Sequence, residues 1–366
     1  MKKALLLILT AAIAASTFTS CLRDAGTIDE GDGVGRGTDR TEISTPADWD
    51  DPIEGETLYN PPPVDNQTEG ATEAPTEAAT DTPTVNVPTG KTWSIVNGKY
   101  TYNIPDPVRN MSDLSDINAT PRTLFDDQGD DATGSWYPGK TIYNLSTGEV
   151  TYVWDRYKST QDLIKKYNGI YRGDEERKVC YFTFDSGYEL GYTTLLLDTL
   201  KEKNCPATFF LVGHYYRTEK DLVNRMINEG HIIGNHTINH YNMTQVTAET
   251  FINEIETVEK EIRDLYPNAN GLRYWRPPMG AANEWVLKIA DQMGLSTVMW
   301  SFAYYDYDVN NQPTVEAALE KAKSGLHNGC VYLFHTESAT NAAMMGELID
   351  WIRSQGYEIL PICDIN

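Results

Sequence analysis

The segment VCYFTFDSG at residues 179–187 combines a run of β-branched and aromatic residues with an acidic residue and a turn. This pattern is typical of a buried strand that ends at Asp185. Active sites of α/β folds collect at the carboxyl ends of their strands. A lone aspartate is more often a turn or capping residue. The other segments therefore decide whether Asp185 has a chemical role.

Six more short strand-like runs follow along the chain, separated by amphipathic stretches. They span 207–212, 231–234, 272–275, 296–300, 330–334 and 357–361. The stretch from Thr247 to Tyr266 has apolar residues on one face at helical spacing, namely Phe251, Ile255, Val258, Ile262 and Leu265. Strands that alternate with helices predict parallel βα units. We therefore expect an α/β fold, a distorted (β/α) barrel of about seven strands.

Polar residues with metal or proton chemistry occur in four further segments, most of them just after a strand. These segments are HTINH at 236–240, RPPMG at 276–280, WSFAYYDY at 300–307 and LFHT at 333–336. His236 and His240 are four residues apart, so on a helix their rings would share one face and could hold one metal ion. Imidazole nitrogens suit Zn²⁺ and similar ions. By itself this pair fits two surface or core histidines equally well.

The remaining polar residues have plausible partners within this set. Arg276 precedes two prolines, which form a stiff loop that would hold its guanidinium in place. An ion pair with Asp185 would suit both a structural and a chemical role of the arginine. His335 ends an apolar strand, and Asp306 could orient it and stabilise its charge. For Asp306 a surface-loop position is the alternative.

Taken together and in this order, the five segments resemble the motifs of the NodB-type polysaccharide deacetylases, carbohydrate esterase family four. The resemblance covers about Lys178 to Pro361. The versions FDSGYE at 184–189, GNH at 234–236 and WSFAY at 300–304 are similar to the delta-lactam-biosynthetic branch of that family. The branch removes the acetyl group from N-acetylmuramic acid in peptidoglycan. The resemblance therefore implies a cell-wall de-N-acetylase.

The resemblance also implies roles for the residues that match the motifs. Asp185 would be the general base oriented by Arg276, and His335 the general acid tuned by Asp306. His236 and His240 would bind a divalent metal, with Zn²⁺ expected and Co²⁺ or Mn²⁺ as alternatives. Substrate contacts would involve Tyr188, Glu189, Trp275, Pro278, Gly280, Tyr304 and Tyr307.

Two residues depart from the family pattern. Ser186 stands where most of the family has an aspartate as third metal ligand and where the muramic branch commonly has asparagine. A serine hydroxyl is a weak neutral ligand, so we expect lower metal affinity. Tyr307 replaces the usual tryptophan, which concerns the lining of the groove and not the chemistry.

Three other functions remain open from the residues. The same site could act on N-acetylglucosamine in peptidoglycan or in another exported glycan. Because Ser186 removes a ligand, the domain could instead be a catalytically impaired glycan-binding module. Binding alone, however, does not require the set Asp185, Arg276, Asp306 and His335. A peptidase is less expected because residue 237 of the His-x-x-x-His pair is threonine and not glutamate.

The N-terminus reads as an export signal. Lys2 and Lys3 precede an apolar run from Ala4 to Ala15, which is too short for a membrane span. Small residues then lead to Cys21, which resembles a lipoprotein processing site, although Phe18 stands where leucine is usual. We expect Cys21 to be lipidated and to anchor the protein at the outer face of the bacterial cytoplasmic membrane. An ordinary secretory signal is the alternative.

Residues 22–90 are acidic and rich in threonine and proline. They hold sixteen acidic and three basic residues, a net of -13 out of -23 for all 366 residues. Such a segment buries too little apolar area to offset its ordering entropy, so we expect a disordered linker. No basic patch is present, which argues against nucleic-acid binding. We therefore expect a signal at 1–21, a linker at 22–90, an extension at 91–170 that packs on the catalytic domain, and a deacetylase domain at 171–366, with the chain acting as a monomer.

Four cysteines follow Cys21 and permit three disulfide pairings, among which the sequence cannot choose. Two of them each open a predicted core strand, so we expect them to be buried small apolar residues. None shows the paired spacing of a zinc–sulfur site. These cysteines are Cys180, Cys205, Cys330 and Cys363.

Overall fold

The structure is a computed structural model that describes residues 92–111, 115–120, 122, 140–143, 150–153 and 158–365. The signal-like segment with Cys21 and the acidic linker 22–90 lie outside these residues. All described residues fall within one unit, 78–366. In the described part of the chain, no helix has both the length and the apolar character needed to cross a membrane.

Seven parallel strands form the central sheet, in the places where the sequence predicts them. In sheet order β10, β5, β6, β7, β8 and β9 lie side by side, and β11 pairs with the start of β5. The bounds are β5 Val179–Ser186, β6 Thr208–Leu211, β7 Ile232–Asn235, β8 Tyr274–Trp275, β9 Ser296–Thr297, β10 Cys330–His335 and β11 Glu358–Ile359.

Two single-residue bridges curl this sheet into a partial barrel. Ile170 pairs with Val298 just after β9, and Phe302 pairs with Tyr332 of β10, both in parallel. The chain that leaves the β9 edge therefore returns to the opposite edge of the sheet. A single bridge stands where a regular barrel would have a full strand pairing. The expected α/β fold with a distorted barrel is thus confirmed.

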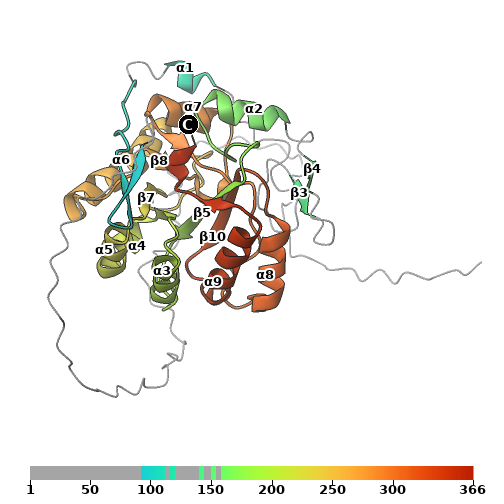
Figure 1. The fold of residues 1–366 in the computed structure, drawn as a ribbon. Helices are drawn as coiled ribbons and strands as arrows, with labels where there is room; N and C mark the ends of the chain where they lie inside the picture. Colours follow the sequence, from blue (N-terminus) through green and yellow to red (C-terminus); the bar gives the residue numbers. More distant parts are fainter. Residues whose placement is uncertain are drawn as a thin grey trace, which may run out of the picture. The chain divides into compact units, whose positions relative to one another are not determined.

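Helices follow most of the strands and cover the sheet (Figure 1). The predicted helix at 247–266 is confirmed as α6, which begins where the Thr247 hydroxyl accepts a hydrogen bond from the Thr250 amide. Helices α3, α8 and α9 lie together beside β5 and β10 (Figure 1). The bounds are α3 Thr193–Glu202, α4 Gly213–Thr218, α5 Lys220–Asn228, α6 Ala248–Leu265, α7 Glu284–Gln292, α8 Val315–Ser324 and α9 Ala339–Ser354, with short 3₁₀ turns at Pro278–Gly280 and Ile362–Asp364.

Both faces of β5 are buried, in two different apolar clusters. Phe182 and Phe184 belong to one cluster with residues of α3 and α9, whereas Val179 and Tyr181 belong to the other with residues of α7. This alternation follows from the two-residue period of a strand. It explains why the strand reads as a continuous apolar run. The same period places Asp185 on the face of Thr183 and Tyr181 in the strand ladder.

The described residues before β5 include two hairpins and two short helices. One hairpin consists of β3 Lys140–Tyr143 and β4 Val150–Val153, and the helix α2 Lys158–Lys166 follows it in the chain. The hairpin of β1 Trp93–Val96 and β2 Lys99–Tyr102 and the single turn α1 Ser115–Asn118 are not in the prediction. The first hairpin contacts the domain that contains the central sheet, because the Tyr102 hydroxyl donates to the Gly230 carbonyl at 2.7 Å.

None of the four cysteines that follow Cys21 forms a disulfide, and all four are buried, as expected for Cys180 and Cys330. Cys180 and Cys330 occupy paired positions on the neighbouring strands β5 and β10. Burial raises the pKa of the Cys205 thiol to about 12, so the thiol stays protonated. These residues therefore serve as small core side chains.

Candidate active site

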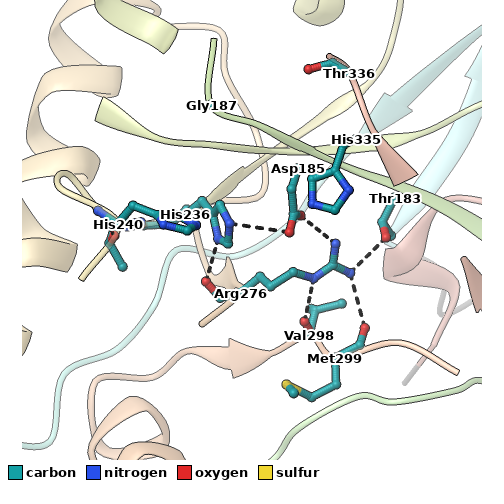
Figure 2. Close-up of polar contacts among 12 residues, drawn as sticks. Thr183, Asp185, Gly187, His236, His240, Arg276, Val298, Met299, His335 and Thr336 are labelled. Carbon is teal, nitrogen blue, oxygen red and sulfur yellow. Dashed lines mark hydrogen bonds and ion pairs between the residues drawn. The ribbon is translucent and has the colours of Figure 1, made fainter. Parts of the chain in front are cut away.

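An ion pair between Asp185 and Arg276 forms the centre of the site. Asp185 lies near the end of β5, and Arg276 follows β8 directly. The Arg276 guanidinium donates to Asp185 Oδ1 at 2.7 Å (Figure 2). The arginine side chain has no exposed surface and that of Asp185 is 9% exposed. The ion pair expected from the sequence is therefore present, and it is buried.

The remaining N–H groups of Arg276 fix its direction. Its Nε donates to the Val298 carbonyl at 2.9 Å, and one terminal nitrogen donates to Thr183 Oγ1 at 2.8 Å. The same nitrogen reaches the Met299 carbonyl at 3.2 Å. Burial alone would raise the pKa of Asp185, but Arg276 and two nearby histidines hold it below its ordinary value. Asp185 is thus a carboxylate at neutral pH.

The two histidines of the 236–240 segment lie in a loop and not on a helix. The backbone of Thr237 has a φ of 66° and that of His240 a φ of 56°, both in the left-handed region. A β-branched residue is rarely found there, at a typical cost of about 1–3 kcal/mol. The loop brings the two imidazole rings together all the same, with centroids 5.0 Å apart.

The tautomer of His236 follows from its hydrogen bond. Its Nδ1 lies 2.8 Å from the Arg276 carbonyl, which can only accept, so Nδ1 carries the proton. The unprotonated Nε2 lies 3.4 Å from Asp185 Oδ2. Burial lowers the pKa of His236, and burial with the neighbouring ring lowers that of His240 to about 3. Both rings are therefore neutral, the form that binds metal ions.

Metal-binding histidines commonly donate their second ring N–H to a backbone carbonyl, as His236 does. Ser186 is fully buried, and among the described residues its hydroxyl has no hydrogen-bond partner. The two neutral imidazoles suit a divalent metal ion, whereas the alternation along β5 places Ser186 on the face opposite Asp185. Among the described residues, no group of three or more His, Cys, Asp or Glu side chains is placed to hold a metal ion. The site in this chain would therefore depend on the two histidines.

His335 and Asp306 form a second charged pair beside Asp185. His335 Nδ1 is 2.7 Å from Asp306 Oδ1, and the His335 amide donates to Asp306 Oδ2 at 2.8 Å. Asn341 of α9 donates to Asp306 Oδ2 at 2.6 Å. Burial would lower the pKa of His335, but Asp306 raises it to about 9. His335 is therefore protonated at neutral pH, with its Nε2–H available to donate.

The residues expected to contact substrate divide into exposed and buried ones. Tyr188 and Tyr307 are 48% and 43% exposed and are available to a ligand. The expectation for Trp275 is wrong, because it has no exposed surface and its indole N–H donates to Thr297 Oγ1 at 2.9 Å. Glu189 accepts backbone N–H groups at the start of α3 and the Tyr215 hydroxyl, so its carboxylate already has partners.

Pro278, Gly280 and Tyr304 are also buried, and each has a local role. Gly280 has a φ of +65°, and a Cβ there would lie 2.4 Å from the Trp300 ring. The Tyr304 hydroxyl donates to Asn341, which in turn holds Asp306. These residues pack beneath the surface of the site. Because they are buried, we do not expect them to contact a ligand directly.

Sequence reasoning missed two residues at the site, Glu337 and Met279, of which Glu337 connects two strand ends. Glu337 accepts hydrogen bonds from the Gly187 amide at 2.7 Å and the Tyr188 amide at 3.0 Å, and so joins the loops after β5 and β10. Burial raises the pKa of Glu337, with His335 opposing the change. Met279, between the expected Pro278 and Gly280, is 56% exposed. The position of Glu337 two residues after His335 is the one sequence signal that could have indicated it.

This geometry defines a class of enzyme. A carboxylate, a protonated imidazole and two neutral imidazoles converge at the carboxyl ends of parallel strands, where a bound water could be deprotonated and a leaving group protonated. The fold and the site therefore describe a hydrolase that combines an α/β fold with a general acid–base pair.

Comparison with known proteins agrees with this class. Residues 172–298 match the polysaccharide deacetylase family. The chain is 39% identical over 211 residues, 58% of its length, to the peptidoglycan-N-acetylmuramic acid deacetylase PdaA of Bacillus subtilis, of which the match covers 80%. The structure of that family 4 carbohydrate esterase aligns with a TM-score of 0.59 and 34% identity, over 67% of this chain and 98% of the other.

A second group of relatives carries a different substrate name. The chain is 32% identical over 186 residues to the peptidoglycan-N-acetylglucosamine deacetylase PgdA of Listeria monocytogenes, covering 50% of this chain and 38% of the relative. The chain belongs to the polysaccharide deacetylase family, which confirms the resemblance seen in the sequence, including its PdaA-like branch.

Proposed function

We propose that this chain removes the acetyl group from N-acetylmuramic acid residues of peptidoglycan by metal-dependent hydrolysis. One observation carries the proposal: Asp185 and His335 lie opposite each other on β5 and β10, and their pKa values are shifted in opposite directions. At neutral pH the site thus contains an ionised base and a protonated acid side by side. Amide hydrolysis requires both.

The proposed reaction assigns a task to each side chain. Asp185 accepts a proton from the attacking water, while Arg276 holds one carboxylate oxygen and leaves the other facing His236. The water oxygen bonds to the acetyl carbon, the carbon–nitrogen bond breaks, and His335 Nε2–H protonates the departing amine. The products are acetate and a free amino sugar.

His236 and His240 would hold the metal ion, with Ser186 as a weak third donor. We propose Zn²⁺, with Co²⁺ or Mn²⁺ as alternatives. A divalent ion supplies Lewis acidity for the acetyl carbonyl and lowers the pKa of a bound water. The neutral state of both imidazoles and the hydrogen bond from His236 Nδ1 to the Arg276 carbonyl support this assignment.

The muramic sugar is proposed because of the relative named as an N-acetylmuramic acid deacetylase, most of whose length the chain matches. N-acetylglucosamine in peptidoglycan is the alternative, favoured by the relatives named for that sugar. Mass spectrometry of muropeptides and chito-oligosaccharides incubated with the full chain and Zn²⁺ decides between them. Loss of one acetyl group from the muramic residue alone supports the proposal, and loss from glucosamine alone contradicts it.

A catalytically impaired glycan-binding module is the second candidate, and Ser186 is the observation that favours it. The buried ion pair of Arg276 with Asp185 and the bond from Asp306 to His335 argue for an active site, because sugar binding alone does not need them. Binding of muropeptides without any loss of acetyl groups, in the presence of Zn²⁺, would identify the module.

We also propose that the protein is exported as a monomer and attached to the membrane through a lipid on Cys21. Cys21 lies outside the described residues, so the proposal rests on the sequence of the signal. In the bacterial host, Cys21→Ala should move the protein from the membrane fraction to the soluble fraction or the medium. Unchanged membrane fractionation of the variant would contradict the anchor.

A further inference from the structure

Glu254 is a buried carboxylate on the core-facing side of helix α6. It is 3% exposed, and the neighbouring buried residues of the helix include Phe251, Ile255 and Val258. Burying a carboxylate is costly unless hydrogen bonds compensate for the water that it loses. The sequence pattern of the helix gives no reason for an acidic residue at this position. Its partners in the structure supply one.

All hydrogen bonds of Glu254 go to the loop that carries His236 and His240. Its Oε2 accepts from the backbone amides of Ile238 at 3.1 Å and Asn239 at 2.9 Å. Its Oε1 accepts from the Asn239 side chain at 2.6 Å. Within the described part of the chain, no Lys, Arg or His side chain forms an ion pair with Glu254. Its charge is therefore balanced by N–H groups of this loop.

The conformation of the loop explains why an anion is needed. Thr237 and His240 both have left-handed backbones, a conformation that a β-branched residue such as Thr237 rarely adopts. Successive amides in such a turn point the same way and form a concavity that binds anions. The Glu254 carboxylate lies in that concavity. Two bonds within the segment add support, from the Thr237 amide to Asn235 Oδ1 and from the His240 amide to Thr237 Oγ1.

We propose that Glu254 is a positioning residue for the metal site: it holds the 236–240 loop in the one shape that brings the two imidazoles together. It touches neither the substrate nor the ion. In the loop with its two left-handed residues, the ring centroids lie 5.0 Å apart. The inference rests on the proposed metal site and adds the residue that prepares that site for the ion.

Zinc affinity of the metal-free full chain, measured by titration calorimetry, tests the inference. Glu254→Ala should weaken Zn²⁺ binding roughly 10–100-fold, the scale of changes in residues that support metal ligands. Glu261→Ala is the matched control. It removes a carboxylate from the same helix, but Glu261 pairs with Arg217 and Tyr216 and not with the loop. The control should bind Zn²⁺ as the wild type does.

Glu254→Gln distinguishes geometry from charge. The amide oxygen of glutamine can still accept from both backbone amides, and the Asn239 side chain can rotate to offer its oxygen to the new NH₂ group. We expect this variant to keep Zn²⁺ affinity within about threefold of the wild type, less than the tenfold that one lost ligand-supporting contact costs. A variant that affected only general stability would lower the melting temperature of the metal-free protein and leave the affinity of the folded protein unchanged.

The outcomes separate this inference from the proposed function. If the wild type itself does not bind Zn²⁺, the proposed metal function fails. If the wild type binds and folded Glu254→Ala binds equally well, or if Glu261→Ala is weakened as much, the positioning role is overturned. If Glu254→Ala does not fold by circular dichroism, Glu254→Asp decides. Its shorter carboxylate should weaken binding at least about tenfold, and unchanged affinity would overturn the inference.

Discussion

Asp185 and His335 are register partners on the neighbouring parallel strands β5 and β10, and each is held by a partner of opposite charge. Arg276 lowers the pKa of Asp185 against the effect of burial, and Asp306 raises that of His335 to about 9. The two groups thus have opposite protonation states over a wide range around neutral pH. This relationship makes the pair suited to act as base and acid, and the pH dependence of turnover should reflect it.

Asp306→Asn should move the alkaline limit of kcat/KM to lower pH. A proposed general acid works only while protonated, and His335 is protonated below a pKa of about 9. Without the Asp306 charge, burial lowers this pKa, so the limit should fall towards or below the ordinary histidine value of about 6.5. Asp308→Asn, which removes a nearby carboxylate bonded to the Asn310 amide, is the control. An unmoved limit in Asp306→Asn would contradict the role of His335.

Arg276→Gln should destabilise the protein and reduce turnover at least a hundredfold, as for the loss of a buried orienting group. Breaking a buried ion pair by removing one partner costs about 3–5 kcal/mol of unfolding free energy. Denaturant unfolding measures this cost. Arg217→Gln is the control, because its ion pair with Glu261 is 47% and 30% exposed and should be worth at most about 1 kcal/mol. Equal losses of unfolding free energy in the two variants would show that the buried pair of Arg276 with Asp185 stabilises the protein no more than the exposed pair does.

Much of the fold could be predicted because the strands have recognisable apolar sequence patterns. The run at 179–187 is apolar throughout since both of its faces are buried. The seven strands and helix α6 follow from such local patterns. The β1–β2 hairpin also has a local signal that the prediction missed, the two-residue turn Asn97-Gly98 with positive φ at both positions. No local pattern indicates where this hairpin packs, because its contacts reach distant residues such as Gly230.

Most residues of the site could be predicted from the sequence, but their geometry could be predicted less well. The pairs Asp185 with Arg276 and His335 with Asp306 lie where the motif order suggests. A four-residue spacing brings two side chains together on a helix, but the two histidines of this chain lie in a loop. In this loop, left-handed residues bring the two imidazole rings together. Glu254, fourteen residues after His240, holds those residues in place. Local spacing carries no sign of such a contact, nor of the burial of Trp275.

Ser186→Asp should tighten Zn²⁺ binding roughly 10–100-fold, because a carboxylate would complete the two-histidine site. The Ser186 hydroxyl is buried and has no hydrogen-bond partner, so a ligand could use that position. Turnover need not rise, since added negative charge weakens the Lewis acidity of the ion. Calorimetry with the wild type as reference measures the change. Unchanged affinity would mean that residue 186 points away from the ion, as the alternation along β5 permits.

Deleting residues 22–90 should leave turnover on soluble substrate within a few-fold of the wild type. The acidic, Pro- and Thr-rich composition motivates this expectation, because such a segment has no apolar core of its own. Initial rates on short muropeptides measure the effect. A collapse in turnover with unchanged folding of the rest would show that this segment contributes to the site.

The most direct test of the proposed hydrolysis is the release of acetate from peptidoglycan fragments in H₂¹⁸O with Zn²⁺ present. If water attacks the acetyl carbon with Asp185 as base, wild-type protein should release acetate that contains one ¹⁸O atom, in equal amount to the free amines formed. Asp185→Asn, which removes the base, should release at least a hundredfold less, the lower range of general acid–base contributions. No acetate from the wild type, or equal release by Asp185→Asn, would contradict the account.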